Sequence, residues 1–409
     1  MTDQDNKQPT LLELCRTSLY IGAIGYGGPA VLALMKKTYV NKKKWITDND
    51  FMDALSLAQV LPSSTGIAIT SYIGYKLHKL WGAVLAPIFT MLPAAVAITV
   101  LAWAYFRFGN LSFVKVLFAG LGALVVALLL NATYFLGKSV FKNIPKDIKK
   151  DSRSIIIGLA TFIGIYSLKF NVTWLILFAA LAGFFLYYFT KDEDNNNAPK
   201  SKTLDITTSR VKGKTLKFWD YTPVLLVFAI FVFGLLTPSL RKIVTTFLGI
   251  GALAFGGGFG SVPLIQHQVV QANGWLNTKQ FIDGIALGQI TPGPIFITAT
   301  FIGYHVAAIF GAVLATLAIF APSTTAMILL SSVHDKVRDL KAVRAVIKGL
   351  QAGFIGLLVS VTIQFALKSL ISWQAWLIFS LAIIWLMILK KNVVWAILAT
   401  IPLSLLLFA

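Results

Sequence analysis

Thirteen apolar segments occupy most of this sequence, and few folds can accommodate them. Several approach the roughly 20 residues that an α-helix needs to cross a hydrocarbon core. Only 13% of the 409 residues are charged, against about 25% in soluble domains, so the polar surface of a soluble protein is missing. The expected fold class is an all-α polytopic membrane protein. The segments run over 12–34, 51–76, 81–106, 112–137, 154–169, 172–189, 222–238, 243–265, 281–304, 310–332, 346–370, 373–389 and 393–408.

The charges are unbalanced, with 36 Lys and Arg against 16 Asp and Glu, a formal net charge of +20. Basic residues gather between the apolar segments, as at 42–44 and 390–391. This distribution is typical of cytoplasmic loops facing anionic lipid, and it argues against nucleic-acid binding. The first ten residues are polar, so no removable signal peptide is expected. The predicted location is the inner or plasma membrane, with multiple passes.

The two halves of the chain repeat each other at an offset of 229 or 230 residues. Chance similarity between apolar segments would not keep Asp, Gln and Pro in register, so a duplication is indicated. The expected organisation is an N-terminal repeat over 11–190, a polar cytoplasmic linker over 191–221 and a C-terminal repeat over 222–409. Matched pairs include Gly22 and Gly251, Asp53 and Asp283, Gln59 and Gln289, Pro62 and Pro292, and Pro93 and Pro322.

Segments 51–76 and 281–304 are each broken near the middle, and a re-entrant hairpin is the expected form. Basic residues flank the first hairpin on both sides, whereas the immediate flanks of the second carry only Lys279. Because basic loops are mostly cytoplasmic, the hairpins are expected to open to opposite sides, as in an inverted-topology repeat. Whether 12–34, 222–238 and 243–265 cross the membrane completely stays open.

Four helix breaks, two in each half, indicate a binding site. They fall at 25–29, 62–66, 255–258 and 291–294, all rich in Gly or Pro. Lipid cannot satisfy the backbone that a break exposes, so breaks persist only where protein or a watery cavity surrounds them. A half-helix that starts there presents free N–H groups and a positive dipole end, which suits a tetrahedral dianion. The alternative is that Gly and Pro only kink packed helices.

The candidate substrate-binding residues lie at these breaks or one turn before them. A Gln amide at that position can donate to an oxyanion without burying a charge, although an interhelical hydrogen bond is the alternative. Asp53 and Asp283 are candidates for proton coupling, against the simpler interpretation of solvated residues near a helix start. Arg16 either attracts an anion or extends to the membrane interface. The substrate-binding set is Gly27, Gly28, Gln59, Ser63, Ser64, Thr65, Gly256, Gly257, Gly258, Gln289, Thr291, Gly293 and Ile295.

No catalytic, cofactor or metal site is expected. The four His residues have no partner at i+4, and the single cysteine, Cys15, excludes an intrachain disulfide. The sequence Gly137-Lys138-Ser139 lacks the first glycine that a phosphate-binding loop requires. The chain is therefore expected not to be an enzyme.

Several short motifs recur around the helix breaks. They are Gly-Tyr-Gly-Gly-Pro-Ala at 25–30, Phe-Gly-Gly-Gly-Phe-Gly at 255–260, Leu-Gly-Gln-Ile-Thr-Pro-Gly-Pro at 287–294, and Ile-Gly-Tyr at 73–75 and 302–304. In these motifs the chain resembles the chromate ion transporter superfamily in its long, two-half form. The first half departs from the family pattern at Pro62-Ser63-Ser64, where Pro-Gly-Pro is expected. The resemblance implies export of chromate, with sulfate as a competing or exchanged ion, and the two tetrahedral dianions are hard to separate by hydrogen-bond geometry.

The expected function is gradient-driven secondary transport of chromate, with export by alternating access between the two halves. The sequence contains no ATP-binding motif. A negative cell interior favours the exit of a dianion by about 2.3 kcal/mol per charge per 100 mV. A transporter or channel for another anion or small solute is the main alternative, followed by a membrane-embedded enzyme or scaffold. Membrane lipid is an expected partner, and a homodimer is left open.

Overall fold

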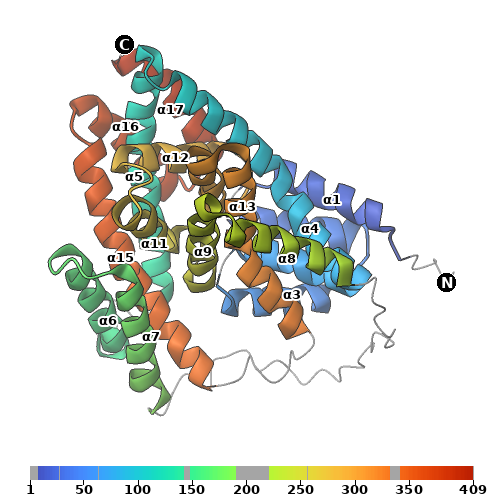
Figure 1. Ribbon diagram of the computed structural model, residues 1–409. Coiled ribbons are helices and arrows are strands. Elements are labelled where there is room, and N and C mark those ends of the chain that lie inside the picture. Colours follow the sequence, from blue (N-terminus) through green and yellow to red (C-terminus); the bar gives the residue numbers. More distant parts are fainter. Residues whose placement is uncertain are drawn as a thin grey trace.

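The computed structural model describes residues 8–26, 28–62, 64–141, 148–189, 221–255, 257–331 and 341–408. Within these ranges the regular elements are helices, and no β-strand is present. Helices of the two halves pack against one another, and Figure 1 shows the overall arrangement. The first half contains α1 (Leu11–Ile24), α2 (Gly28–Met35), the π-helical turn η1 (Lys36–Lys42), α3 (Asp48–Val60), α4 (Thr65–Phe108), α5 (Ser112–Val140), α6 (Ile148–Tyr166) and α7 (Val172–Tyr188).

The second half begins with a helix, α8 (Thr222–Leu236), that has no counterpart in the first. It packs on α9, α4 and α13. The remaining elements repeat the order of the first half. They are α9 (Pro238–Leu253), α10 (Gly257–Gly260), α11 (Val262–Gln266), η4 (His267–Ala272), α12 (Thr278–Ile290), η5 (Ile295–Ile297), α13 (Thr298–Ser331), α15 (Lys341–Ser369), α16 (Trp373–Ile383), η6 (Ile384–Ile388) and α17 (Val393–Phe408).

Four helices in the described part are long and apolar enough to cross a bilayer: Thr65–Phe108, Ser112–Val140, Ile295–Leu330 and Lys341–Ser369. Large apolar side chains lie exposed on the surface, such as Trp103, Phe310 and Trp395, which suits contact with lipid. Helices α1, α8 and α9 have 14, 15 and 16 residues, fewer than the roughly 20 of a full span. The chain is a multi-pass, all-α membrane protein.

Small details of the backbone repeat between the halves. A side-chain capping box starts both α3, at Thr47, and α12, at Asn277. Helix α4 is sharply kinked at Lys79 (φ 53°, ψ −137°) and α13 at Ala308 (φ 48°, ψ −139°). Both kinks fall between apolar segments that the sequence analysis treated as separate. The duplication therefore persists in local backbone geometry, including at sites without a polar side chain.

Glycines allow the helices of each half to approach closely. A Cβ added at Gly22 would overlap the carbonyl oxygen of Thr90, and one at Gly251 would overlap that of Ile319. These contacts hold α1 against α4 and α9 against α13 at matched positions. Glycine at such crossings replaces side-chain packing with direct backbone contact, as is common between membrane helices.

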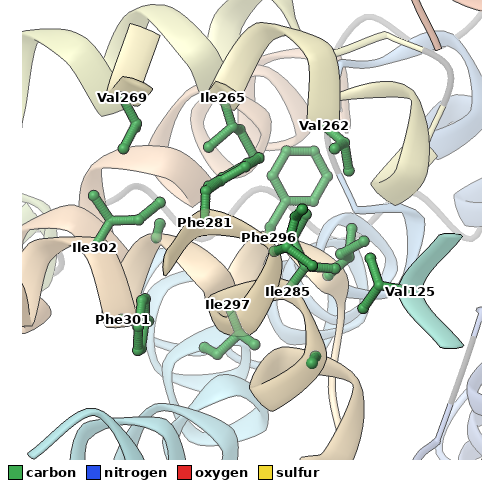
Figure 2. Packing of buried hydrophobic residues seen from close by; sticks show 14 of the residues in the cluster. Val125, Val262, Ile265, Val269, Phe281, Ile285, Phe296, Ile297, Phe301 and Ile302 are labelled. Atoms are coloured by element: carbon green, nitrogen blue, oxygen red, sulfur yellow. The ribbon is translucent and has the colours of Figure 1, made fainter. Parts of the chain in front are cut away.

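The last helix pair of each half packs on a helix of the other half. The pair α6 and α7 packs on α15 of the second half, whereas α16 and α17 pack on α5 of the first, as the lower-left and upper-left parts of Figure 1 show. Helices α4 and α13 also pack together. One apolar cluster spans both halves, and Figure 2 shows Val125 of α5 with Ile285 and Phe296 of the second half. Each half therefore completes the core of the other.

Candidate functional site

A cavity of about 530 Å³ lies where the helix breaks of the two halves meet. Residues next to each of the four breaks line it, together with apolar side chains of α1 and α2. No charged side chain belongs to the described lining. The lining residues that lie at or next to the breaks are Gly25, Tyr26, Ser64, Thr65, Gly66, Gly257, Gly258, Thr291, Gly293, Pro294 and Ile295.

The first and last breaks are joined directly through their backbones. Tyr26 and Gly293 form an isolated parallel β-bridge, and the Tyr26 hydroxyl donates to the carbonyl oxygen of Ile290 at 3.2 Å. Gly293 has φ 141°, a region that only glycine occupies without strain. Gly293, in the last break, thus permits the backbone contact between the halves.

Helix starts supply backbone donors to the cavity. Helix α4 begins at Thr65 after an extended Ser64, and η5 begins at Ile295 after an extended Pro294. The first N–H groups of a helix have no intrahelical acceptor. Because Thr65, Gly66 and Ile295 line the cavity, it combines unpaired N–H groups with the positive ends of helix dipoles. This neutral but electropositive lining suits an anion.

Polar side chains add a small number of further donors. Gln289 lines the cavity, is half-buried and makes no hydrogen bond to any described residue. Asn392, in the turn before α17, accepts from the Val394 N–H at 3.0 Å through Oδ1, which leaves its amide N–H groups for a ligand. The hydroxyls of Thr90 and Thr291 donate to backbone carbonyls. The sequence analysis missed Thr90 and Asn392, although Asn392 is a polar residue between two apolar segments.

The structure brings most of the predicted residues together, but Gln59 lies elsewhere. Gln59 is exposed and lines an adjoining cavity of about 240 Å³, with Ser139 and Gln351. The two cavities share Thr65 and Gly257. Gly28 starts α2 but does not line the central cavity. Gly27, Ser63 and Gly256 lie outside the described residues. The predicted residues in the central lining are Ser64, Thr65, Gly257, Gly258, Gln289, Thr291, Gly293 and Ile295.

The duplicated aspartates occupy different environments, and neither lines the central cavity. Asp283 is 1% exposed, accepts a hydrogen bond from the Tyr105 hydroxyl at 2.7 Å and pairs with Lys279 at 3.0 Å. Asp53 is half-buried and makes no ion pair with a described residue. Tyr105 belongs to α4, so Asp283 connects the halves. Within the described ranges, no group of three or more His, Cys, Asp or Glu side chains is placed to hold a metal ion.

Comparison with known proteins identifies the family. A family model described as chromate transporter matches residues 12–184 and 241–405. An uncharacterized transporter of Methanocaldococcus jannaschii is 32% identical over 394 residues, which are 95% of this chain and 92% of the relative. A chromate transport protein of Cupriavidus metallidurans is 31% identical over 363 residues, 88% of this chain and 84% of the relative. No solved structure matches the chain. The chain belongs to the chromate transporter family.

Proposed function

We propose that this protein carries chromate across the membrane and binds it in the central cavity. The observation that carries the proposal is the meeting of all four helix breaks around one cavity without charged lining residues. The relatives named chromate transport proteins, such as that of Cupriavidus metallidurans, support chromate as the substrate. Backbone N–H groups at Thr65 and Ile295 would each donate to an oxygen of the dianion, and Gln289 would add an amide donor.

An uncharged lining is well suited to release as well as to binding. A buried Lys or Arg would hold a dianion strongly, whereas helix dipoles and amide donors provide a weaker field. Sulfate offers the same charge and tetrahedral shape, so we expect it to compete with chromate. The cavity also has room for part of the hydration shell, and a larger anion or small solute is the alternative substrate.

Alternating access is the mechanism we propose, with the two halves as an inverted-topology repeat. The matched breaks and the kinks at Lys79 and Ala308 give each half the same places to bend. The cavity that contains Gln59 shares Thr65 and Gly257 with the central one. We propose that this adjoining cavity is a vestibule. The anion would pass through it to reach the central cavity from the side of the membrane on which the re-entrant hairpin α3–α4 opens.

Export is the proposed direction, because a negative interior favours loss of a dianion by about 2.3 kcal/mol per charge per 100 mV. If uptake operates instead, a coupled proton is required. Asp283 is then the better candidate, since it is buried and contacts both halves through Tyr105, whereas Asp53 is partly exposed.

The test is flux in proteoliposomes that contain the purified protein. We expect saturable chromate uptake that is driven by an inside-positive potential and is competitively inhibited by sulfate. Gln289→Ala should lower this flux, with Lys242→Gln as the control on an exposed α9 residue. Flux that does not saturate would indicate a channel, and the absence of flux for both anions would refute the proposal.

A further inference from the structure

A second pocket, which is lined by basic residues, lies in the first half, away from the cavity at the helix breaks. Its volume is about 330 Å³, and it is formed by α1, α2, η1 and the turn that follows. Four of the lining side chains are cationic, and none of the described lining residues is acidic. The lining residues are Arg16, Thr17, Tyr20, Leu34, Lys37, Thr38, Lys42 and Lys43.

The four cations of this pocket outnumber the acidic groups that interact with them. Arg16, Lys37, Lys42 and Lys43 are exposed and form no ion pair with a described residue. The neighbouring Lys36, by contrast, pairs with Asp48 at 2.6 Å. Glu13 interacts electrostatically with Lys43 and Arg16, and the Lys43 ammonium lies 5.4 Å from the centroid of the Trp45 ring. One carboxylate thus faces four cations. The pocket therefore carries a local positive charge that an anionic ligand can neutralise.

Two threonines with largely buried side chains line the same pocket. Thr17 is 8% exposed and Thr38 is 7% exposed. Neither hydroxyl makes a hydrogen bond to a described residue, so both can donate to a ligand in the pocket. Hydroxyls beside several cations are suited to phosphate oxygens, which accept several hydrogen bonds at once.

The pocket borders a surface that suits lipid chains. Leu12, Tyr20 and Ile24 are 60%, 52% and 45% exposed. Arg16 lies between Leu12 and Tyr20, and the four residues follow one another at four-residue spacing on one face of α1. Arg16 thus interrupts an exposed apolar stripe. A cation in this position is favourable where its head reaches a phosphate at the membrane interface.

The four basic residues of the pocket have no Lys or Arg at the matched positions of the second half. The backbone hydrogen bonds from Trp45 to Tyr39 and from Trp275 to Val269 fix the correspondence at 230 residues in this region. Lys37, Lys42 and Lys43 therefore correspond to His267, Ala272 and Asn273, and at the offset of 229 in α1, Arg16 corresponds to Thr245. The basic pocket is thus a property of one half, and in an inverted repeat it faces one side of the membrane.

We propose that this pocket binds the phosphate headgroup of an anionic phospholipid whose acyl chains lie along the exposed face of α1. The four cations and two hydroxyls hold the phosphate, and Leu12, Tyr20 and Ile24 contact the chains. This site is separate from the central cavity, and its existence does not depend on which solute the protein carries. It anchors the first half to an anionic leaflet.

The experiment measures lipid retained by the full-length protein during purification in detergent, after incubation with phosphatidylglycerol or phosphatidylcholine, by native mass spectrometry. We expect wild type to retain phosphatidylglycerol selectively. In the double variant Lys37→Gln and Lys42→Gln, affinity for phosphatidylglycerol should fall about tenfold or more, because each basic residue contributes substantially to anionic-lipid binding. The same variant should retain phosphatidylcholine as wild type does.

The matched control removes two exposed lysines distant from the pocket, in the variant Lys115→Gln and Lys242→Gln. This control should keep wild-type affinity, which separates a specific site from the loss of net charge. Equal retention by the pocket variant and wild type would overturn the proposal. So would displacement of the lipid by millimolar sulfate, or saturable sulfate binding at this pocket without lipid, since both indicate a site for a free oxyanion.

Discussion

The two breaks that precede α4 and α13 arose by duplication but differ in their roles. At the second break, Gly293 forms a backbone bridge to Tyr26, and Gln289 lines the central cavity. At the first break, Ser64 and Thr65 reach the same cavity, whereas Gln59 lies in the adjoining one. The duplication preserved the course of the backbone, while the side chains at matched positions acquired different environments.

Buried or partly buried aspartates of α3 and α12 also differ in the partners that they contact outside their own helix. Asp50 of α3 pairs with Lys76 of α4, within the first half. Asp283 of α12 accepts a hydrogen bond from Tyr105 of the opposite half. The second hairpin is therefore more deeply embedded between the halves than the first. Backbone symmetry and chemical asymmetry can be tested separately by changing matched residues.

The largest effects should come from changes at positions where the halves are alike. A Cβ at Gly82 would overlap the carbonyl oxygen of Gly74, and a Cβ at Gly311 would overlap that of Gly303. We expect Gly82→Ala and Gly311→Ala each to lower stability by about 3 kcal/mol through overpacking. Yield of folded protein and thermal unfolding in detergent measure this. Gly249→Ala is the control, because no atom lies within 4 Å of its added Cβ. Wild-type stability in Gly82→Ala or in Gly311→Ala would show that the two crossings are not packed equally tightly.

The second prediction concerns the backbone of the second break. Gly293→Ala places a side chain at φ 141°, with its Cβ 3.0 Å from that of Ala94. We expect strain of about 2 kcal/mol and a corresponding loss of chromate flux. Gly66→Ala in the first break meets only ordinary contacts at 3.5 Å and 3.6 Å and should alter flux less. Equal losses would show that the two breaks are equally constrained.

A smaller effect is expected for the paired glutamines. Gln289→Ala removes an amide donor to the anion, worth about 1.5 kcal/mol, so the chromate KM should rise about tenfold. Gln59→Ala, at an exposed position outside the central cavity, should change KM less than about twofold. The KM values from proteoliposome flux test this difference. If the two substitutions act equally, the vestibule belongs to the binding site.

The smallest effect should separate the paired aspartates. Asp283→Ala leaves the Tyr105 hydroxyl without its partner and should lower the free energy of unfolding by about 1 kcal/mol. Asp53→Ala should lower it by less than about 0.5 kcal/mol. Thermal unfolding of both variants in one detergent makes the comparison. When Tyr105→Phe is already present, Asp283→Ala should destabilise the protein less, because the hydroxyl that bonds to Asp283 is gone. Equal destabilisation by the two alanine substitutions would remove the distinction between them.

Much of the local structure could be predicted from the sequence. The apolar segments, the duplicated motifs and the Gly and Pro residues indicated helix breaks at 25–29, 62–66, 255–258 and 291–294. In the structure, the helices that precede these breaks end at Ile24, Val60, Leu253 and Ile290. Breaks depend on local conformational preferences, which Gly and Pro determine within a few residues. Eight of the predicted binding residues line the central cavity, whereas Gln59 and Gly28 do not, and the lining residues Thr90 and Asn392 were not predicted.

The tertiary structure determined the features that depend on contacts between distant residues. In the structure, the last helix pair of each half packs on the other half. Gln59 and Gln289 line different cavities, and Asn392 and Tyr26 line the same one. A sequence match assigns equivalent residues but does not specify their neighbours, because packing between helices depends on side chains hundreds of positions apart. Sequence alone thus determined a duplicated membrane protein with broken helices, and only the packing of the halves decided which matched residues share a site.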